Sequence, residues 1–211
     1  MVPKRKLDIN GQLLTLFIVG FSIIVYCSPG LSELFVYKRQ AILSGEVWRL
    51  LTAPFVHFSA SHIFWDILIF SIAGIAINAS GFPGFWIVCC LTAFIPGLLY
   101  IPACPDLQYY GGLSGVATGS AAYYCLCQIF MNGGKIHIWV LILAVMGVKI
   151  LIEIALHEPL FVNSDSADFI VLPSAHIVGY LGAMTTMIFI HKYRRTQTVY
   201  QVAPWCIPKE K

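Results

Sequence analysis

Apolar runs long enough to cross a bilayer constrain this chain more than any other feature. A membrane-spanning helix needs about 20 mostly apolar residues, or slightly fewer where the bilayer is thin. Only 11% of the residues are charged, against about a quarter in a typical soluble domain, so no separate soluble domain is expected. We place the spanning helices at roughly residues 12–27, 62–80, 84–101, 112–130, 138–156 and 174–191. The runs predict an all-α membrane protein, a six-helix bundle that makes residues 1–211 a single membrane domain.

The first run follows the basic segment KRK at residues 4–6, so a cleavable signal peptide is an alternative to a retained helix. No small-residue cleavage site follows the run, and Tyr26 before Cys27 does not fit a lipoprotein signal. We therefore interpret residues 12–27 as a retained helix.

Basic residues predict the orientation of the bundle, because loops rich in Lys and Arg stay in the cytoplasm. Residues 4–6 precede the first helix, and Lys192, Arg194 and Arg195 follow the last one. The loops of the opposite side carry these acidic residues: Glu33, Glu46, Asp106, Glu158, Asp165 and Asp168. Both termini are therefore expected in the cytoplasm. The net charge of +3 is too small and too scattered to indicate a nucleic-acid partner.

The seven cysteines show none of the paired spacings typical of a metal site, so we expect no metal and no cofactor. Cys27 and Cys104 both fall near the predicted outer face, and a disulfide between them is a hypothesis for an oxidising compartment. Lys149 and Glu153 lie four residues apart in one helix, and we interpret them as a pair that neutralises itself.

Polar residues of three predicted helices fall at one depth near the outer face. Ser114, His62 and His176 each lie at the beginning of a helix that runs from outside to inside, and Asp66 lies one turn below His62. Polar groups inside a membrane are costly and suggest function, and a serine becomes a nucleophile when a histidine removes its proton. A serine among glycines can instead serve helix packing, and an interfacial histidine can be an anchor. The shared depth favours a Ser–His site.

Glycines surround the candidate serine in the string GGLSGVATG. Gly111, Gly112 and Gly115 let the chain turn tightly and let another backbone approach Ser114. The last predicted helix carries small residues facing roughly one side: Gly179, Gly182 and Ala183. We expect a close approach of these two helices, which would bring Ser114 and His176 together.

Three segments resemble the rhomboid intramembrane serine proteases: GGLSGVATG, AHIVGYLGA and WRLLTAPFVHFSASHIFWD. The resemblance covers about residues 12–191, and the short chain with GLSGVATG is most similar to the rhombosortase branch. It implies a Ser–His dyad without a carboxylate partner, in which Ser114 is the nucleophile and His176 is the base and then the acid. It further implies that His62 and the Ser114 backbone N–H stabilise the oxyanion.

The resemblance also assigns supporting roles. Gly112 and Gly115 would shape the site, and Trp48 and Arg49 would hold the first outer loop. The sequence departs from the family at Asp66, where rhomboids usually have asparagine. A protonated Asp66 would donate to the oxyanion, whereas an ionised one would hold His62 as a cation.

A second departure is Thr118, where the better-known rhomboids have a tyrosine against the catalytic histidine. Both departures concern the efficiency of the site and the shape of its pocket, and neither removes Ser114 or His176.

The resemblance implies substrates anchored in the lipid bilayer by a transmembrane tail. For a rhombosortase these are exported bacterial proteins with a C-terminal Gly-Gly motif, an apolar helix and a basic tail. The enzyme would then lie in the bacterial inner membrane with its active site toward the periplasm. The wider family cleaves single-span proteins near helix-breaking small residues, and this general rhomboid activity stays an alternative.

Other classes of protein explain the sequence less well. A membrane metalloprotease would need a motif such as H-E-x-x-H, which is absent, and His57 and His62 would fall on different faces of one helix. An inactive rhomboid-like protein that binds membrane helices generally lacks the serine or the histidine, and both are present here. A transporter is not favoured either, because the sequence shows no visible internal repeat.

Overall fold

The computed structural model describes residues 8–156, 160 and 172–202, and it is almost entirely helical. The long helices are α1 (Ile9–Tyr26), α5 (Ala60–Ala79), α6 (Phe85–Ala103), α7 (Ser114–Cys127), α8 (Ile136–Leu156) and α9 (Pro173–Val202). Short elements join α1 to α5: α2 (Pro29–Phe35), β1 (Tyr37–Lys38), α3 (Arg39–Leu43), α4 (Arg49–Thr52) and the 3₁₀ turn η1 (Ala53–Phe55). The strand β2 (Tyr109–Tyr110) precedes α7, and the π-helical turn η2 (Gln128–Asn132) follows it.

The expected all-α membrane bundle is confirmed, with one difference in its helices. Among the described residues, five helices are long and apolar enough to span a membrane: α1, α5, α6, α8 and α9. The fourth predicted span, 112–130, corresponds to the 14-residue helix α7, which continues directly into the π-helical turn η2. It begins at Ser114 because Gly112 has a φ of +124°, which an α-helix cannot include. The chain is a multi-pass membrane protein.

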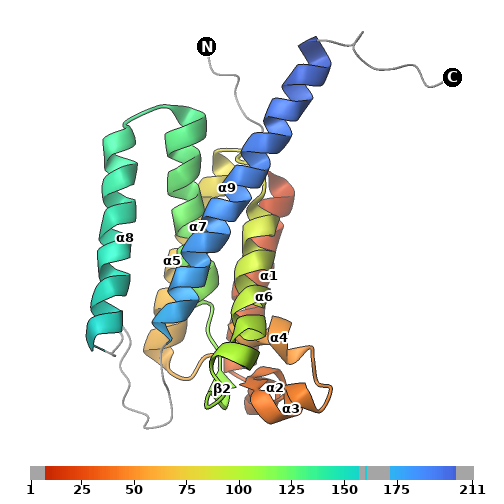
Figure 1. Cartoon of the computed structure of the whole chain (residues 1–211). Coiled ribbons are helices and arrows are strands. Elements are labelled where there is room, and N and C mark those ends of the chain that lie inside the picture. The colour runs from red at the N-terminus through yellow and green to blue at the C-terminus, as the bar shows by residue number, and fades with distance from the viewer. Residues whose placement is uncertain (1–7, 157–159, 161–171, 203–211) are drawn as a thin grey trace, which may run out of the picture.

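The short helix α7 lies at the centre of the bundle (Figure 1). It packs against α5, α6 and α9, and most of its side chains are buried. The helix α8 lies at the periphery, and Ile150 and Glu153 are its only buried residues within the described chain. A bundle centred on a short helix gives polar groups at the beginning of that helix a buried setting inside the membrane domain.

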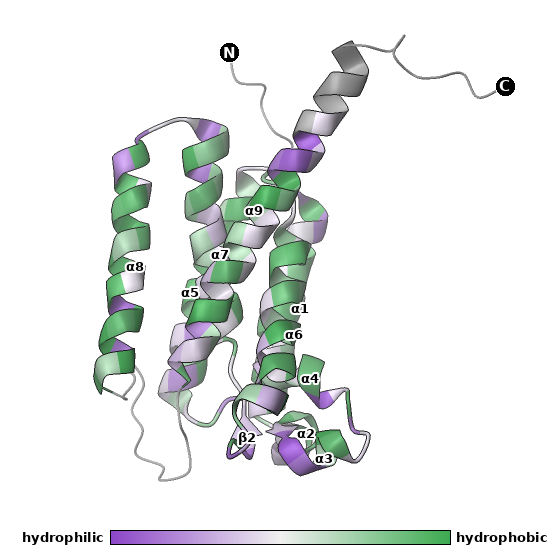
Figure 2. Ribbon diagram, viewed as in Figure 1, coloured by the Kyte–Doolittle hydropathy of each residue, from purple (hydrophilic) through white to green (hydrophobic). Residues whose placement is uncertain are grey.

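The elements between α1 and α5 form a cap at one end of the bundle (Figure 1). β1 pairs antiparallel with β2, so Tyr110 lies opposite Tyr37 and the cap is tied to the segment that leads into α7. The beginning of α1 and the last turns of α9 lie at the opposite end. Figure 2 shows polar residues concentrated at these two ends and apolar residues along the helices between them, as a bilayer requires.

The hypothesis of a disulfide between Cys27 and Cys104 is wrong for this structure, because both cysteines carry free thiols. Cys104 packs against the cluster that holds Tyr37, Leu50 and Tyr100. Cys27 is exposed and caps the end of α1. Both residues end helices near the cap, but they lie in different surroundings.

Candidate active site

Ser114 is the first residue of α7, and a glycine turn places it there. At Gly112 the left-handed φ of +124° favours glycine. A Cβ at this position would also lie 2.6 Å from His62 Nε2, so no side chain fits between the turn and α5. The backbone N–H of Gly112 donates to the Ala53 carbonyl at 3.2 Å, which joins the turn to η1. Ser114 itself is half-buried.

His176 lies in the first turn of α9, where α9 crosses α7 at glycines. A Cβ on Gly115 would lie 3.0 Å from the carbonyl oxygen of Ala175, and a Cβ on Gly179 would lie 3.0 Å from the Gly119 nitrogen. The two helices therefore touch backbone to backbone. Because Gly115 follows Ser114 and Ala175 precedes His176, this contact brings the two candidate residues to neighbouring positions.

Gly182 lies roughly on the side of α9 that carries Gly179, as predicted, but it does not take part in the contact with α7. A Cβ on Gly182 would lie 2.7 Å from Thr92 Cγ2, so this glycine faces α6 rather than α7. Three residues turn an α-helix by about 300°, which leaves Gly182 about 60° away from Gly179 around the axis. The close approach to α7 thus depends on Gly179, Gly115 and Gly119.

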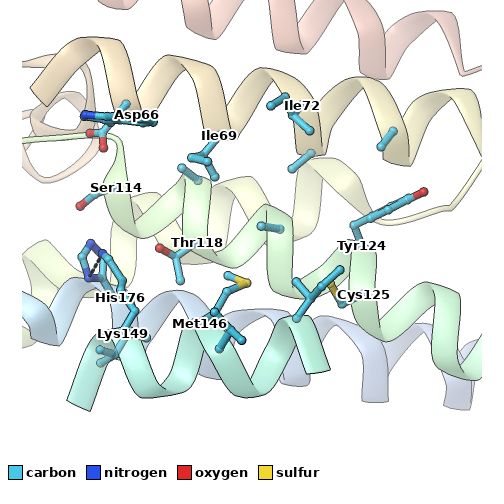
Figure 3. Close-up of a pocket in the computed structure, with 18 of the residues that line it drawn as sticks. Asp66, Ile69, Ile72, Ser114, Thr118, Tyr124, Cys125, Met146, Lys149 and His176 are labelled. Atoms are coloured by element: carbon cyan, nitrogen blue, oxygen red, sulfur yellow. Dashed lines mark hydrogen bonds between the residues drawn. The ribbon is translucent and has the colours of Figure 1, made fainter. Parts of the chain in front are cut away.

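Ser114 and His176 line the same cavity, which has a volume of about 690 Å³. Residues of α5, α7 and α8 form most of its wall, and His176 is the residue that α9 contributes. In Figure 3 the Ser114 hydroxyl and the His176 ring face each other at one end of this cavity. In the described part of the chain the hydrogen-bond partners of the His176 ring are Glu153 and Lys149, not Ser114. Hydrogen bonds between catalytic groups often form only when substrate is bound.

On α5, a buried carboxylate lies between two histidines. Asp66 Oδ2 is 3.2 Å from His62 Nε2 and 3.2 Å from His57 Nε2, and all three side chains are buried. His57 precedes α5, whose N-cap is Ser59, so the assumption that both histidines lie on one helix is wrong and the two rings can meet. No group of His, Cys, Asp or Glu side chains in residues 8–156, 160 and 172–202 is arranged to hold a metal ion.

His176 has a carboxylate partner, which corrects the expectation of a dyad without one. Its Nδ1 lies 3.0 Å from Glu153 Oε2, and both side chains are buried. Glu153 also pairs with Lys149, whose Nζ lies 2.9 Å from Oε1. The interpretation of Lys149 and Glu153 as a pair that neutralises only itself is therefore incomplete. The end of α8 approaches the beginning of α9, and the carboxylate contacts the imidazole as well as the lysine.

Comparison with protein families matches residues 44–193 to the Rhomboid domain. The matched segment holds the turn before α7, the α7–α9 crossing and both candidate residues. The chain belongs to the rhomboid family. A comparison with curated proteins gave no match. Rhomboid-family members are generally intramembrane serine proteases that act on membrane-protein substrates.

Thr118, at which this rhomboid differs from the better-known members, lies on the cavity wall one turn after Ser114. Figure 3 shows Thr118 pointing into the cavity between Ser114 and Met146. A threonine there leaves room that a tyrosine would fill.

Arg49, whose side chain is buried, holds together the segment between α1 and α5 of the rhomboid. Its Nη1 donates to the carbonyls of Glu33 at 2.7 Å and Val36 at 2.8 Å, and its Nε pairs with Glu46 at 2.7 Å. Trp48 is exposed and its indole N–H donates to the Leu34 carbonyl at 3.3 Å. These contacts hold α2 and α4 together, at a distance from the cavity.

Reasoning from the sequence missed the roles of His57 and Glu153. A signal was available for Glu153, because a charged residue near the end of the predicted helix 138–156 falls at the predicted depth of His176. For His57 the signal was weaker, since its position relative to Asp66 depends on where α5 begins.

Proposed function

We propose that this rhomboid is an intramembrane serine endopeptidase in which Ser114 is the nucleophile and His176 the general base. The observation that carries the proposal is that a hydroxyl and an imidazole from separate helices face each other on one cavity. The turn at Gly112 and the contact of Gly115 with α9 support it, because they leave space for a substrate backbone beside Ser114. A serine that served only helix packing would not need to open onto a cavity.

The reaction would run in two steps. As Ser114 Oγ bonds to the scissile carbonyl carbon, His176 Nε2 takes the hydroxyl proton and the carbonyl electron pair moves onto oxygen. The C–N bond then breaks, and His176 gives the proton to the leaving nitrogen. Water next attacks the acyl carbon and passes a proton to His176, which returns it to Ser114 Oγ as the acid product leaves. His62 and the Ser114 backbone N–H are the proposed oxyanion donors.

We further propose substrates with an apolar transmembrane tail, and specifically the C-terminal Gly-Gly sorting tails of exported proteins. The cavity wall supports the apolar part of this proposal, since it includes Ile69, Ile72, Val145 and Met146. The Gly-Gly motif suits a site in which the substrate backbone must come close to Ser114. The specific proposal of a Gly-Gly sorting tail as substrate rests on the resemblance of GLSGVATG to rhombosortases.

A matched set of variants tests both proposals. A reporter with a Gly-Gly motif, an apolar helix and a basic tail is expected to be cleaved by the wild type, and cleavage should fall about 10³-fold or more in Ser114→Ala and His176→Ala. A fluorophosphonate should label the wild type and fail on Ser114→Ala. The control is Ser120→Ala, a buried serine of α7 that does not line the cavity.

The outcomes separate the alternatives. Equal labelling of wild type and Ser114→Ala would contradict the nucleophile assignment. Cleavage of a single-span reporter without the Gly-Gly motif at the same rate would favour general rhomboid activity over sorting.

A further inference from the structure

The contacts of Glu153 go beyond an ion pair within α8. Its side chain is 2% exposed, and each carboxylate oxygen has a separate set of partners. Oε1 accepts from Lys149 Nζ at 2.9 Å and from the backbone N–H of Leu160 at 3.2 Å. Oε2 lies 3.0 Å from His176 Nδ1. A residue that served only to neutralise Lys149 would not need its second oxygen on a ring of another helix.

These partners decide which nitrogen of His176 carries the proton. Lys149 is an ammonium donor and lies 3.5 Å from Nδ1, but its shorter contact is to the carboxylate. Two donors on Oε1 match an ionised carboxylate, which has no proton to give to the ring. The Nδ1–H therefore donates to Oε2, and the lone pair stays on Nε2, the nitrogen that must act on Ser114.

We infer that Glu153 is a positioning residue of the active site, which holds His176 in the tautomer with a basic Nε2 and stabilises the imidazolium formed during catalysis. This inference rests on the proposed function, and it changes a Ser–His dyad into a Ser114–His176–Glu153 arrangement. The Nδ1 proton stays on the ring throughout, because the carboxylate acts through charge and orientation.

Lys149 has the opposite effect on the imidazolium. Its positive charge lies 3.5 Å from Nδ1 and competes for the same carboxylate. Removing Lys149 should leave Glu153 more fully available to His176. If the ion pair served only to stabilise α8, removing either Lys149 or Glu153 should lower activity to the same extent.

The variants Glu153→Gln and Lys149→Met separate these roles. Glu153→Gln keeps the size and an acceptor for Nδ1–H but removes the charge, and we expect kcat to fall about 10²-fold with little change in KM. Glu153→Asp should recover part of the loss. Lys149→Met should lower kcat less than Glu153→Gln does, or raise it. Gln128→Met, which removes a buried polar side chain at the far end of α7, controls for loss of stability.

Equal losses in Glu153→Gln and Lys149→Met, in proportion to lower thermal stability, would overturn the inference. A readout independent of activity is nitrogen NMR of histidine-labelled protein, with the His176 signals assigned from His176→Gln. The expected spectrum of the wild type has the proton on Nδ1, and a proton on Nε2 would overturn the inference. An unlabelled serine together with the expected tautomer would instead contradict the proposed function alone.

Discussion

Asp66 lies between two histidines, and its protonation state decides the charge of this group. Its Oδ2 contacts both His57 and His62 at 3.2 Å, in a buried setting. One carboxylate oxygen that lies close to two imidazole rings favours an ionised carboxylate, because either ring can carry the compensating positive charge. We therefore prefer the hypothesis that Asp66 holds His62 as a cation over the hypothesis that a protonated Asp66 donates to the oxyanion.

The variant Asp66→Asn distinguishes these two hypotheses. If Asp66 is ionised, the amide removes the counter-charge of His62, and the rate of reporter cleavage at neutral pH should fall about 10²-fold, the usual cost of losing one oxyanion donor. The control is Asp106→Asn, an exposed aspartate in the loop before β2. An Asp66→Asn enzyme as active as the wild type would support the protonated carboxyl instead.

The crossing of α7 and α9 is the element on which the site depends. A Cβ on Gly179 would overlap the carbonyl oxygen of Gly115, and backbone cannot move aside as a flexible side chain can. The helices would have to separate, and Ser114 and His176 would move apart with them. Inserting one methyl group into such a contact costs about 1–3 kcal/mol.

Gly179→Ala is therefore expected to lower the temperature of thermal unfolding and the rate of fluorophosphonate labelling together. Gly147→Ala on α8 is the matched control, because no atom lies within 4 Å of a Cβ there. Alanine in that helix interior should leave stability unchanged or raise it by about 0.5–1 kcal/mol. Normal labelling in Gly179→Ala would contradict the dependence of the site on this crossing.

At the scale of the whole molecule, charge asymmetry predicts the orientation in the membrane. The last turns of α9, with Lys192 and Arg194, lie at one end of the bundle, and the cap with its acidic residues lies at the other (Figure 2). Several residues of the charge argument, at 4–6, 158, 165 and 168, lie outside the described residues, as does the side chain of Arg195. We keep the orientation with both termini in the cytoplasm as a proposal.

A reporter fused after residue 202 and an epitope inserted at Asp106 test this orientation in a bacterial inner membrane. A reporter that functions only in the cytoplasm should be active in this fusion, and one that functions only in the periplasm should be inactive. The epitope should be accessible from the periplasm. A C-terminus that is accessible from the periplasm would place Ser114 at the cytoplasmic side, and this would contradict the proposal that the enzyme acts on exported substrates.

The sequence by itself determined the class of the protein and the level of its candidate site. Apolar runs predicted six spanning helices, and five of them are long and apolar enough to span a membrane in the part of the chain that the structure describes. The positions of Ser114, His62 and His176 along their helices placed these residues at one end of the bundle. These properties follow from local composition, because hydropathy and helical rise depend only on position along the chain.

Only the tertiary structure decided which side chains meet. It placed Glu153 on His176 and set His57 opposite Asp66, and it kept the thiol of Cys104 in surroundings different from those of Cys27. Sequence position gives the depth of a residue, but the rotation of each helix and its choice of neighbour come from packing. In this protein the decisive contacts are those of Gly115 and Gly119 with Gly179, and the contact between the end of α8 and the beginning of α9. Neither contact can be predicted from the sequence of one helix alone.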